Sequence, residues 1–252
     1  FAGGVESILL AGRSGTGKSA LSAKLRDVQD RTVKPLIISG KYEEVQSLPY
    51  LAILEALREF VMLKVSQGGD ELGRYRERLV ESLGDNLHVI AEFLPELRLV
   101  TGDLAESAQG DPMERNQRFR IAIQAFFETM SDAANPVILF LDDLQWAESA
   151  SITLLEDVFR TAQLSHLLLV GAYRDNTHGA KEKVDRLVQA FEDTGLKAET
   201  IQIRPLKSAD PLELVAAAVN LADGSDVAYI APVQPGKAQG HAANLDDSGT
   251  AS

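Results

Sequence analysis

The residues that point most directly to chemistry form the segment GRSGTGKS, which runs from Gly12 to Ser19. This segment fits the pattern G-x-x-x-x-G-K-[ST], in which the backbone N–H groups of a tight glycine-rich turn face phosphate oxygens. The pattern predicts that Lys18 reaches the β- and γ-phosphates of a nucleotide and that the Ser19 hydroxyl ligates Mg²⁺. A helix that begins at Lys18 would add the positive end of its dipole at the same place.

The context of this loop decides between a phosphate site and a simple glycine-rich turn. The apolar run SILLA precedes the loop and an amphipathic pattern follows it, as the strand–loop–helix motif requires. We therefore favour the phosphate site. The loop residues assigned to nucleotide binding are Gly12, Ser14, Gly15, Thr16, Gly17, Lys18 and Ser19.

Two carboxylates, Asp142 and Asp143, follow the apolar run VILFL at residues 137–141. An Asp at the tip of such a strand can hold Mg²⁺ and its water shell opposite Ser19, and we predict this role for Asp142. Asp143 is predicted to orient or deprotonate an attacking water. The alternative is that the paired acids cap the following helix. Their co-occurrence with the phosphate loop favours the metal and water site.

Arg174 follows the apolar run LLLVGA and one tyrosine. Ligands of doubly wound sheets bind outside the carboxyl ends of the strands, so a cation at this position can contact a γ-phosphate or stabilise charge during phosphoryl transfer. The alternative is a solvent-exposed ion pair between Arg174 and its neighbour Asp175. The catalytic assignment is therefore Asp143, Lys18 and Arg174, and the metal assignment is Ser19 and Asp142.

The elements that must position these residues can be read from the spacing of apolar residues. Five β-type runs lie at residues 7–11, 36–39, 137–141, 167–172 and 200–204. The third and fourth are almost wholly apolar, as expected for central strands, whereas the fifth alternates like an edge strand. Apolar residues at helical spacing fill the intervals at 21–28, 119–130, 152–162 and 184–191. Strands that alternate with helices predict an α/β fold with a parallel sheet.

Three further segments complete the organisation of the chain. Helical patterns without a strand predict a helical insertion at about residues 45–110 within a core of residues 1–206. Residues 207–222 are predicted to form a terminal helix, in which Asp210 and Pro211 stand at the N-terminus. Residues 223–252 are rich in Ala, Gly, Asp and Ser, and are predicted to form a disordered tail.

Composition excludes several classes of protein. A net charge of -12 argues against a surface dedicated to nucleic acid. The absence of cysteine excludes disulfides and thiolate zinc sites and fits a reducing, cytoplasmic environment. No apolar run reaches the roughly 20 residues of a membrane-spanning helix. The first residues lack the basic flank of a signal peptide and enter a strand almost at once, so we expect a segment of a longer protein.

Taken together, these residues resemble an AAA-type ATPase domain of the signal-transduction (STAND) kind. The resemblance is greatest to the ATPase module of large bacterial hybrid kinases, which lies between serine/threonine-kinase-like and histidine-kinase domains. The matching stretches are GRSGTGKSAL, ISGKYEEVQSLPYLAILEALRE, LGDNLHVIAEFLPELRLVTG, VILFLDDLQWAESASITLLE and HLLLVGAYRDN. They follow the family's order, and DDLQWA followed by GAYRDN is a specific pair.

The resemblance implies a three-layer fold with sheet order 5-1-4-3-2, with ATP and Mg²⁺ as cofactors and other domains of a longer signalling chain as partners. It makes Gly12 to Ser19 the Walker A loop, Asp142 and Asp143 the Walker B acids, and Arg174 the arginine after the sensor strand. Many relatives carry Glu where this chain has Asp143, and the shorter side chain predicts slow hydrolysis. The segment before the first strand and the lid after the fifth are missing from the pattern.

Three functions remain open at this point. The leading hypothesis is an ATP-binding, slowly hydrolysing regulatory switch. A nucleotide-retaining interaction module without turnover is the second, and a small-molecule kinase is the third. Such kinases usually carry an Arg-rich lid, and the sequence has no arginine cluster of that kind. Phosphate release measured with and without candidate acceptors separates the three.

Overall fold

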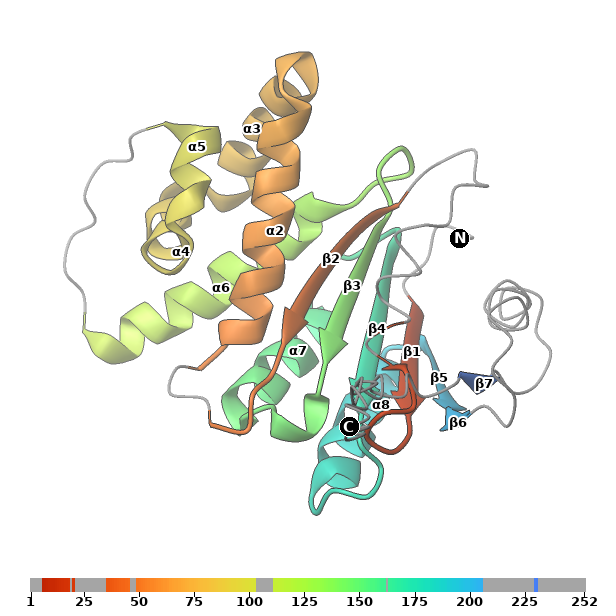
Figure 1. Ribbon diagram of the computed structural model, residues 1–252. Coiled ribbons are helices and arrows are strands. Elements are labelled where there is room, and N and C mark those ends of the chain that lie inside the picture. Colours follow the sequence, from red (N-terminus) through yellow and green to blue (C-terminus); the bar gives the residue numbers. More distant parts are fainter. Residues whose placement is uncertain are drawn as a thin grey trace, which may run out of the picture.

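The centre of the protein is a five-stranded parallel sheet in the order β2-β3-β4-β1-β5 (Figure 1). The structure is a computed structural model that describes residues 6–18, 20, 35–45, 49–102, 111–161, 163–205 and 229–230. The strands of the sheet are β1 (Glu6–Ala11), β2 (Leu36–Lys41), β3 (Val137–Asp142), β4 (Leu167–Tyr173) and β5 (Lys197–Gln202). Read from the other edge, this is the order 5-1-4-3-2, so the expected topology is confirmed.

The first four predicted strands are present, each extended by one or two residues. The fifth prediction was wrong in its bounds, because β5 begins at Lys197 and ends at Gln202. Pairing along the whole of β1, from Glu6 opposite Lys197, sets these bounds rather than the apolar alternation. The next residues, Arg204–Pro205, form a short strand β6 that pairs with β7 (Tyr229–Ile230). As predicted, β5 lies at an edge of the sheet.

Helices follow the strands and fill the interval between β2 and β3 (Figure 1). The α-helices are α2 (Leu51–Gln67), α3 (Gly69–Leu83), α4 (Leu87–Phe93), α5 (Arg98–Thr101), α6 (Pro112–Met130), α7 (Ser149–Thr161) and α8 (Ala180–Asp193). Single 3-10 turns lie at η1 (Gly84–Asn86), η2 (Pro95–Leu97) and η3 (Leu144–Trp146). Helices α2 to α5 occupy the segment in which the sequence predicts a helical insertion. Within the described ranges, no helix is both long and apolar enough to cross a membrane.

Alternating residues of the strands supply the two faces of the sheet. On one face, residues such as Leu9 and Leu139 join a continuous core with α2, α6, α7 and α8. On the other face, Leu10, Phe140 and Val170 are buried as well. Burial of both faces explains why the central strands are almost wholly apolar. The predicted helix at 21–28, the terminal helix at 207–222 and the tail except for β7 lie outside the described residues.

A close contact between α2 and β2 fixes the start of the helical insertion on the sheet. Gly40 of β2 faces the backbone of α2 so closely that a Cβ atom there would lie 1.8 Å from the carbonyl oxygen of Ala52. Glu59 of α2 accepts hydrogen bonds from the backbone N–H and the hydroxyl of Ser39. These contacts hold the carboxyl end of β2 in place, and Lys41 stands at that end.

Replacement of this glycine is expected to destabilise the fold. Gly40→Ala forces β2 and α2 apart, and overpacking of this kind costs about 1–3 kcal/mol or more. The matched control is Gly73→Ala in α3, where an added Cβ meets nothing within 4 Å and the residue is exposed. That change is expected to stabilise the protein by about 0.5–1 kcal/mol, because alanine loses less backbone entropy than glycine in a helix. Urea unfolding of both variants checks the pair, and a shift in the same direction for both would contradict it.

Candidate functional site

The loop that follows β1 has the backbone that a phosphate cradle requires. Gly15 and Gly17 have φ angles of 78° and 91°, a left-handed conformation that side chains with a Cβ rarely adopt. Gly12 is required for a different reason. A Cβ atom at Gly12 would lie 2.6 Å from the backbone oxygen of Ile203, which follows β5. Glycine is therefore needed at the start of the loop for space and within it for a left-handed backbone, and the motif has glycine at positions 12 and 17.

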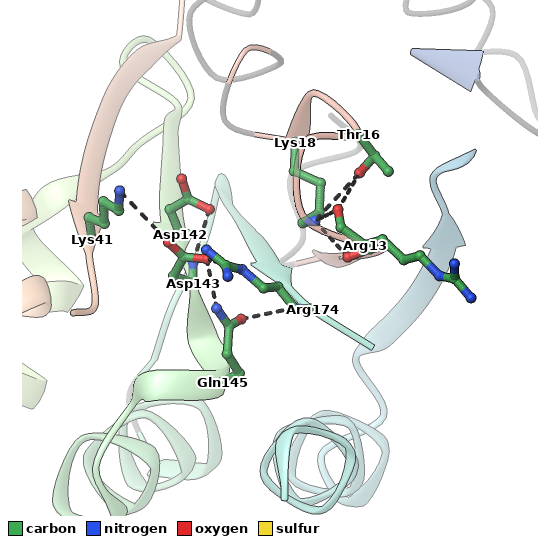
Figure 2. Close-up of polar contacts among 9 residues, drawn as sticks. Arg13, Thr16, Lys18, Lys41, Asp142, Asp143, Gln145 and Arg174 are labelled. Atoms are coloured by element: carbon green, nitrogen blue, oxygen red, sulfur yellow. Dashed lines mark hydrogen bonds and ion pairs between the residues drawn. The ribbon is translucent and has the colours of Figure 1, made fainter. Parts of the chain in front are cut away.

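Lys18 is buried at the base of this loop, with 6% of its surface exposed. Its Nζ donates hydrogen bonds to the carbonyl oxygens of Gly12 at 2.6 Å and Arg13 at 2.8 Å (Figure 2). Burial lowers the pKa of the Lys18 ammonium, while the carboxylates of Asp142 and Asp143 act in the opposite direction. The lysine thus contacts the carbonyl groups of its own loop, which the sequence did not indicate.

The other assigned loop residues differ in exposure. Thr16 is buried and its hydroxyl donates to the Arg13 carbonyl at 2.9 Å, which closes the turn. Ser14 is exposed at the tip of the loop. The side chain of Arg13 extends away from Lys18 in Figure 2. Ser19, predicted as a ligand of Mg²⁺, lies outside the described residues.

The two acids stand at the tip of β3, as predicted. Asp142 is 7% exposed, and one of its carboxylate oxygens accepts a hydrogen bond from the Asp143 N–H at 2.9 Å. Asp143 has a left-handed backbone, with φ 55° and ψ 42°, which turns the chain sharply at the end of the strand. Asp143 stands at the N-cap position of η3, but its side chain makes no capping hydrogen bond to this described turn. Asp143 therefore does not cap η3 through its side chain.

Arg174 follows β4 and turns toward the acids. Its Nε lies 3.5 Å from Oδ1 of Asp143, and its side chain is 35% exposed (Figure 2). The neighbouring Asp175, considered as its partner from the sequence, instead accepts a hydrogen bond from Gln202 at 2.7 Å. Because β3 and β4 are adjacent in the sheet, the tip of one strand can reach the tip of the other.

Two further residues at this edge were missed by reasoning from the sequence. Gln145 donates from its Nε2 to Oδ1 of Asp143 at 2.7 Å, and Lys41 Nζ lies 3.7 Å from Oδ2 of the same carboxylate (Figure 2). A signal existed for both. Gln145 lies in the DDLQWA stretch, and Lys41 ends a β-type run at the edge where ligands bind.

A cavity of about 480 Å³ lies elsewhere, between α2, α3 and the turn before β3. Its lining includes Lys64, Tyr75, Arg78 and Asp132, and none of the residues predicted for the phosphate and acid site. Lys64 is buried there, with its Nζ 5.6 Å from the centre of the Phe60 ring. The cavity is therefore separate from the candidate site.

Comparisons with known proteins bear on this arrangement. The hybrid signal transduction histidine kinase G of Dictyostelium discoideum is 36% identical over 154 residues, which are 61% of this chain and 4% of that protein. The solved structures found include two of the plasmid coupling protein TrwB, one bound to the ATP analogue ADPNP and one of the unbound form TrwBdeltaN70. Their identities are 17% and 15%, and both comparisons cover 73% of this chain. They cover 68% and 66% of those chains, with TM-scores of 0.25 and 0.26, too low to support any argument.

The family comparison is decisive. The profile of the AAA ATPase domain matches residues 1–170, a range that contains the phosphate loop and both acids. This match covers more than half of the chain. The protein therefore belongs to the AAA ATPase domain family.

Proposed function

We propose that this domain binds ATP with Mg²⁺, hydrolyses it slowly and acts as a regulatory switch within a longer signal-transduction protein. The observation that carries the proposal is the convergence of Lys18, Asp143 and Arg174 at one edge of the sheet. Lys18 from the loop after β1, Asp143 from the tip of β3 and Arg174 from the tip of β4 supply two cations and a carboxylate there, which is the composition of a phosphoryl-transfer site. The relative that is a hybrid signal transduction histidine kinase supports the signalling role.

Each residue has a distinct part in this proposal. Lys18 holds the β- and γ-phosphates by charge-assisted hydrogen bonds, and the loop N–H groups complete the cradle. Asp142 holds the magnesium shell together with Ser19. Its carboxylate suits a hard cation, and Mg²⁺ usually takes one or two carboxylates and completes its shell with water and phosphate oxygens. In this proposal Asp142 and Ser19 would hold the ion together with phosphate oxygens and water.

The surroundings of Asp143 support slow turnover. To orient an attacking water, this carboxylate must offer it a free oxygen in the correct direction. Its Oδ1 already contacts Gln145 and Arg174, while Oδ2 lies 3.7 Å from Nζ of Lys41, an exposed side chain. Water therefore competes with Lys41 for Oδ2, and Asp has a shorter reach than Glu. Slow hydrolysis suits a switch, because the ATP-bound form persists long enough to be read by another domain.

The same contacts favour one alternative, a nucleotide-retaining module without turnover. If Lys41 keeps the attacking water away from Oδ2 of Asp143, ATP stays bound and intact. Phosphate release from purified domain with Mg-ATP separates the two functions, and added acceptor molecules test the small-molecule kinase at the same time. Release that does not depend on any acceptor supports the slow ATPase. If no phosphate is released above background, the nucleotide-retaining module is the function that remains. Phosphate release or transfer that occurs only with an acceptor would indicate the small-molecule kinase.

Arg174→Ala is expected to weaken ATP affinity more than ADP affinity. In this proposal the guanidinium contacts the γ-phosphate, which only ATP presents. A charge-assisted contact of this kind is worth about 1.5–3 kcal/mol, so the ratio of the two affinities should shift by about tenfold or more. Parallel calorimetric titrations of ATP and ADP measure it. The control is Arg186→Ala in α8, whose guanidinium pairs with Glu156 of α7 instead. Equal losses for both nucleotides in Arg174→Ala would make the residue structural.

A further inference from the structure

The turn after the acids is held directly on the neighbouring strand. Leu144, the first residue of η3, packs on Gly171 of β4 so closely that a Cβ there would lie 2.5 Å from the leucine Cδ1. Leu144 is fully buried in the core, and the next residue, Gln145, is 2% exposed. The contact with β4 therefore fixes the turn in a position from which the Gln145 side chain reaches the tips of both β3 and β4.

The carboxamide of Gln145 uses both of its polar atoms between those tips. Its Nε2 donates to Oδ1 of Asp143 at 2.7 Å, and its Oε1 accepts from the backbone N–H of Arg174 at 2.9 Å (Figure 2). The orientation of the amide follows from its partners. In the flipped amide, an oxygen would face the carboxylate and an NH₂ would face the N–H, so both contacts would become repulsive.

A third contact joins this bridge to helix α8. The backbone carbonyl of Gln145 accepts a hydrogen bond from Nζ of Lys183 at 2.9 Å. Lys183 lies in the first turns of α8, and burial lowers the pKa of its ammonium. One residue thus ties together the tip of β3, the tip of β4 and the start of α8.

We propose that Gln145 is a positioning residue that sets Asp143 and Arg174 in a fixed relation, so that hydrolysis depends on recognition of the γ-phosphate. This inference rests on the proposed function of those two residues. Gln145 holds Oδ1 of Asp143 and thereby directs Oδ2 toward the water. By holding the backbone of Arg174, it also directs the guanidinium to the same edge. A buried glutamine with a merely structural role would stabilise the fold without linking the two functions.

The test uses Gln145→Met in the whole 252-residue chain, since methionine has a similar volume and lacks both hydrogen-bonding groups. Loss of hydrogen bonds to charged or positioned groups predicts that phosphate release and the preference for ATP over ADP each fall about tenfold, while ADP affinity stays within about twofold. A lower melting temperature with an unchanged nucleotide preference and turnover rate would overturn the proposal. Gln189→Met, at an exposed position of α8, is the matched control.

A double variant decides whether Gln145 acts through Arg174. If it does, Gln145→Met combined with Arg174→Ala loses no more ATP preference than Arg174→Ala alone. Additive losses would overturn the proposal. If Gln145→Met does not fold, Gln145→Glu is used in its place. Glutamate keeps an acceptor for the Arg174 N–H but has no donor for Asp143, so turnover should still fall. Normal turnover in Gln145→Glu would overturn the proposal. If the parent chain does not hydrolyse ATP, the proposed function and this inference are both overturned. If the parent hydrolyses ATP and Gln145→Met has the same turnover and nucleotide preference, the inference alone is overturned.

Discussion

Lys18→Ala is expected to abolish ATP binding while the domain remains folded. The buried ammonium is the cation at the base of the loop, and each of its hydrogen bonds to phosphate contributes about 1.5–3 kcal/mol. Loss of two such bonds lowers affinity by about 100-fold or more. Two loop carbonyls lose their hydrogen bonds from the lysine, but the left-handed backbone at Gly15 and Gly17 is left in place, so the fold should persist. Titration with ATP measures the affinity, and circular dichroism measures the fold.

A control variant and the pH dependence of ATP affinity test the same assignment of Lys18. Lys181→Met removes one positive charge from an exposed position of α8 and should leave ATP affinity unchanged. Because burial lowers the pKa of Lys18, ATP affinity of the parent should fall with rising pH before a free lysine, with a pKa near 10.5, would lose its proton. Affinity falls as pH rises because the charged ammonium is the form of Lys18 that binds phosphate. Unchanged ATP affinity in Lys18→Ala would refute the assignment of the loop.

Substitution of the two neighbouring acids is expected to separate binding from turnover. Asp142→Asn should weaken Mg²⁺-dependent ATP affinity by about 10- to 100-fold, because a charged ligand becomes neutral. Asp143→Asn should leave affinity near that of the parent and reduce turnover by about 10²-fold or more, the usual contribution of a general base. ATP titrations with and without Mg²⁺ measure the affinity of each variant, and phosphate release measures its turnover.

Asparagine is the suitable replacement at both positions. At position 142 its amide oxygen can still accept the hydrogen bond from the Asp143 N–H. At position 143 asparagine adopts the left-handed backbone about as readily as aspartate, so φ 55° is not disturbed. The substitutions therefore remove charge and leave the local structure. If both variants bound Mg-ATP and hydrolysed it like the parent, the acids would have a structural role only.

Residue types and spacing were sufficient for the loop, the first four strands and the polar residues at the tips of β3 and β4. Local pattern carries this information because glycines at fixed offsets specify the turn, and a strand buried on both faces must be apolar along its length. The carboxyl ends of parallel strands share one edge, so Lys18, Asp142 and Arg174 were predicted to lie together. The strand order itself came from the resemblance to AAA ATPase domains, since apolar periodicity does not specify which strands are neighbours.

Which side chains meet at that edge was decided only by the tertiary structure. From the sequence, Arg174 had Asp175 as its nearest candidate partner, but the adjacency of β3 and β4 pairs it with Asp143 and places Gln145 between them. Contacts between strand tips depend on the order of the sheet and on how far a turn such as η3 is pressed against the next strand. Likewise, the need for glycine at Gly40 follows from the approach of α2, which is distant in the chain and leaves no local pattern.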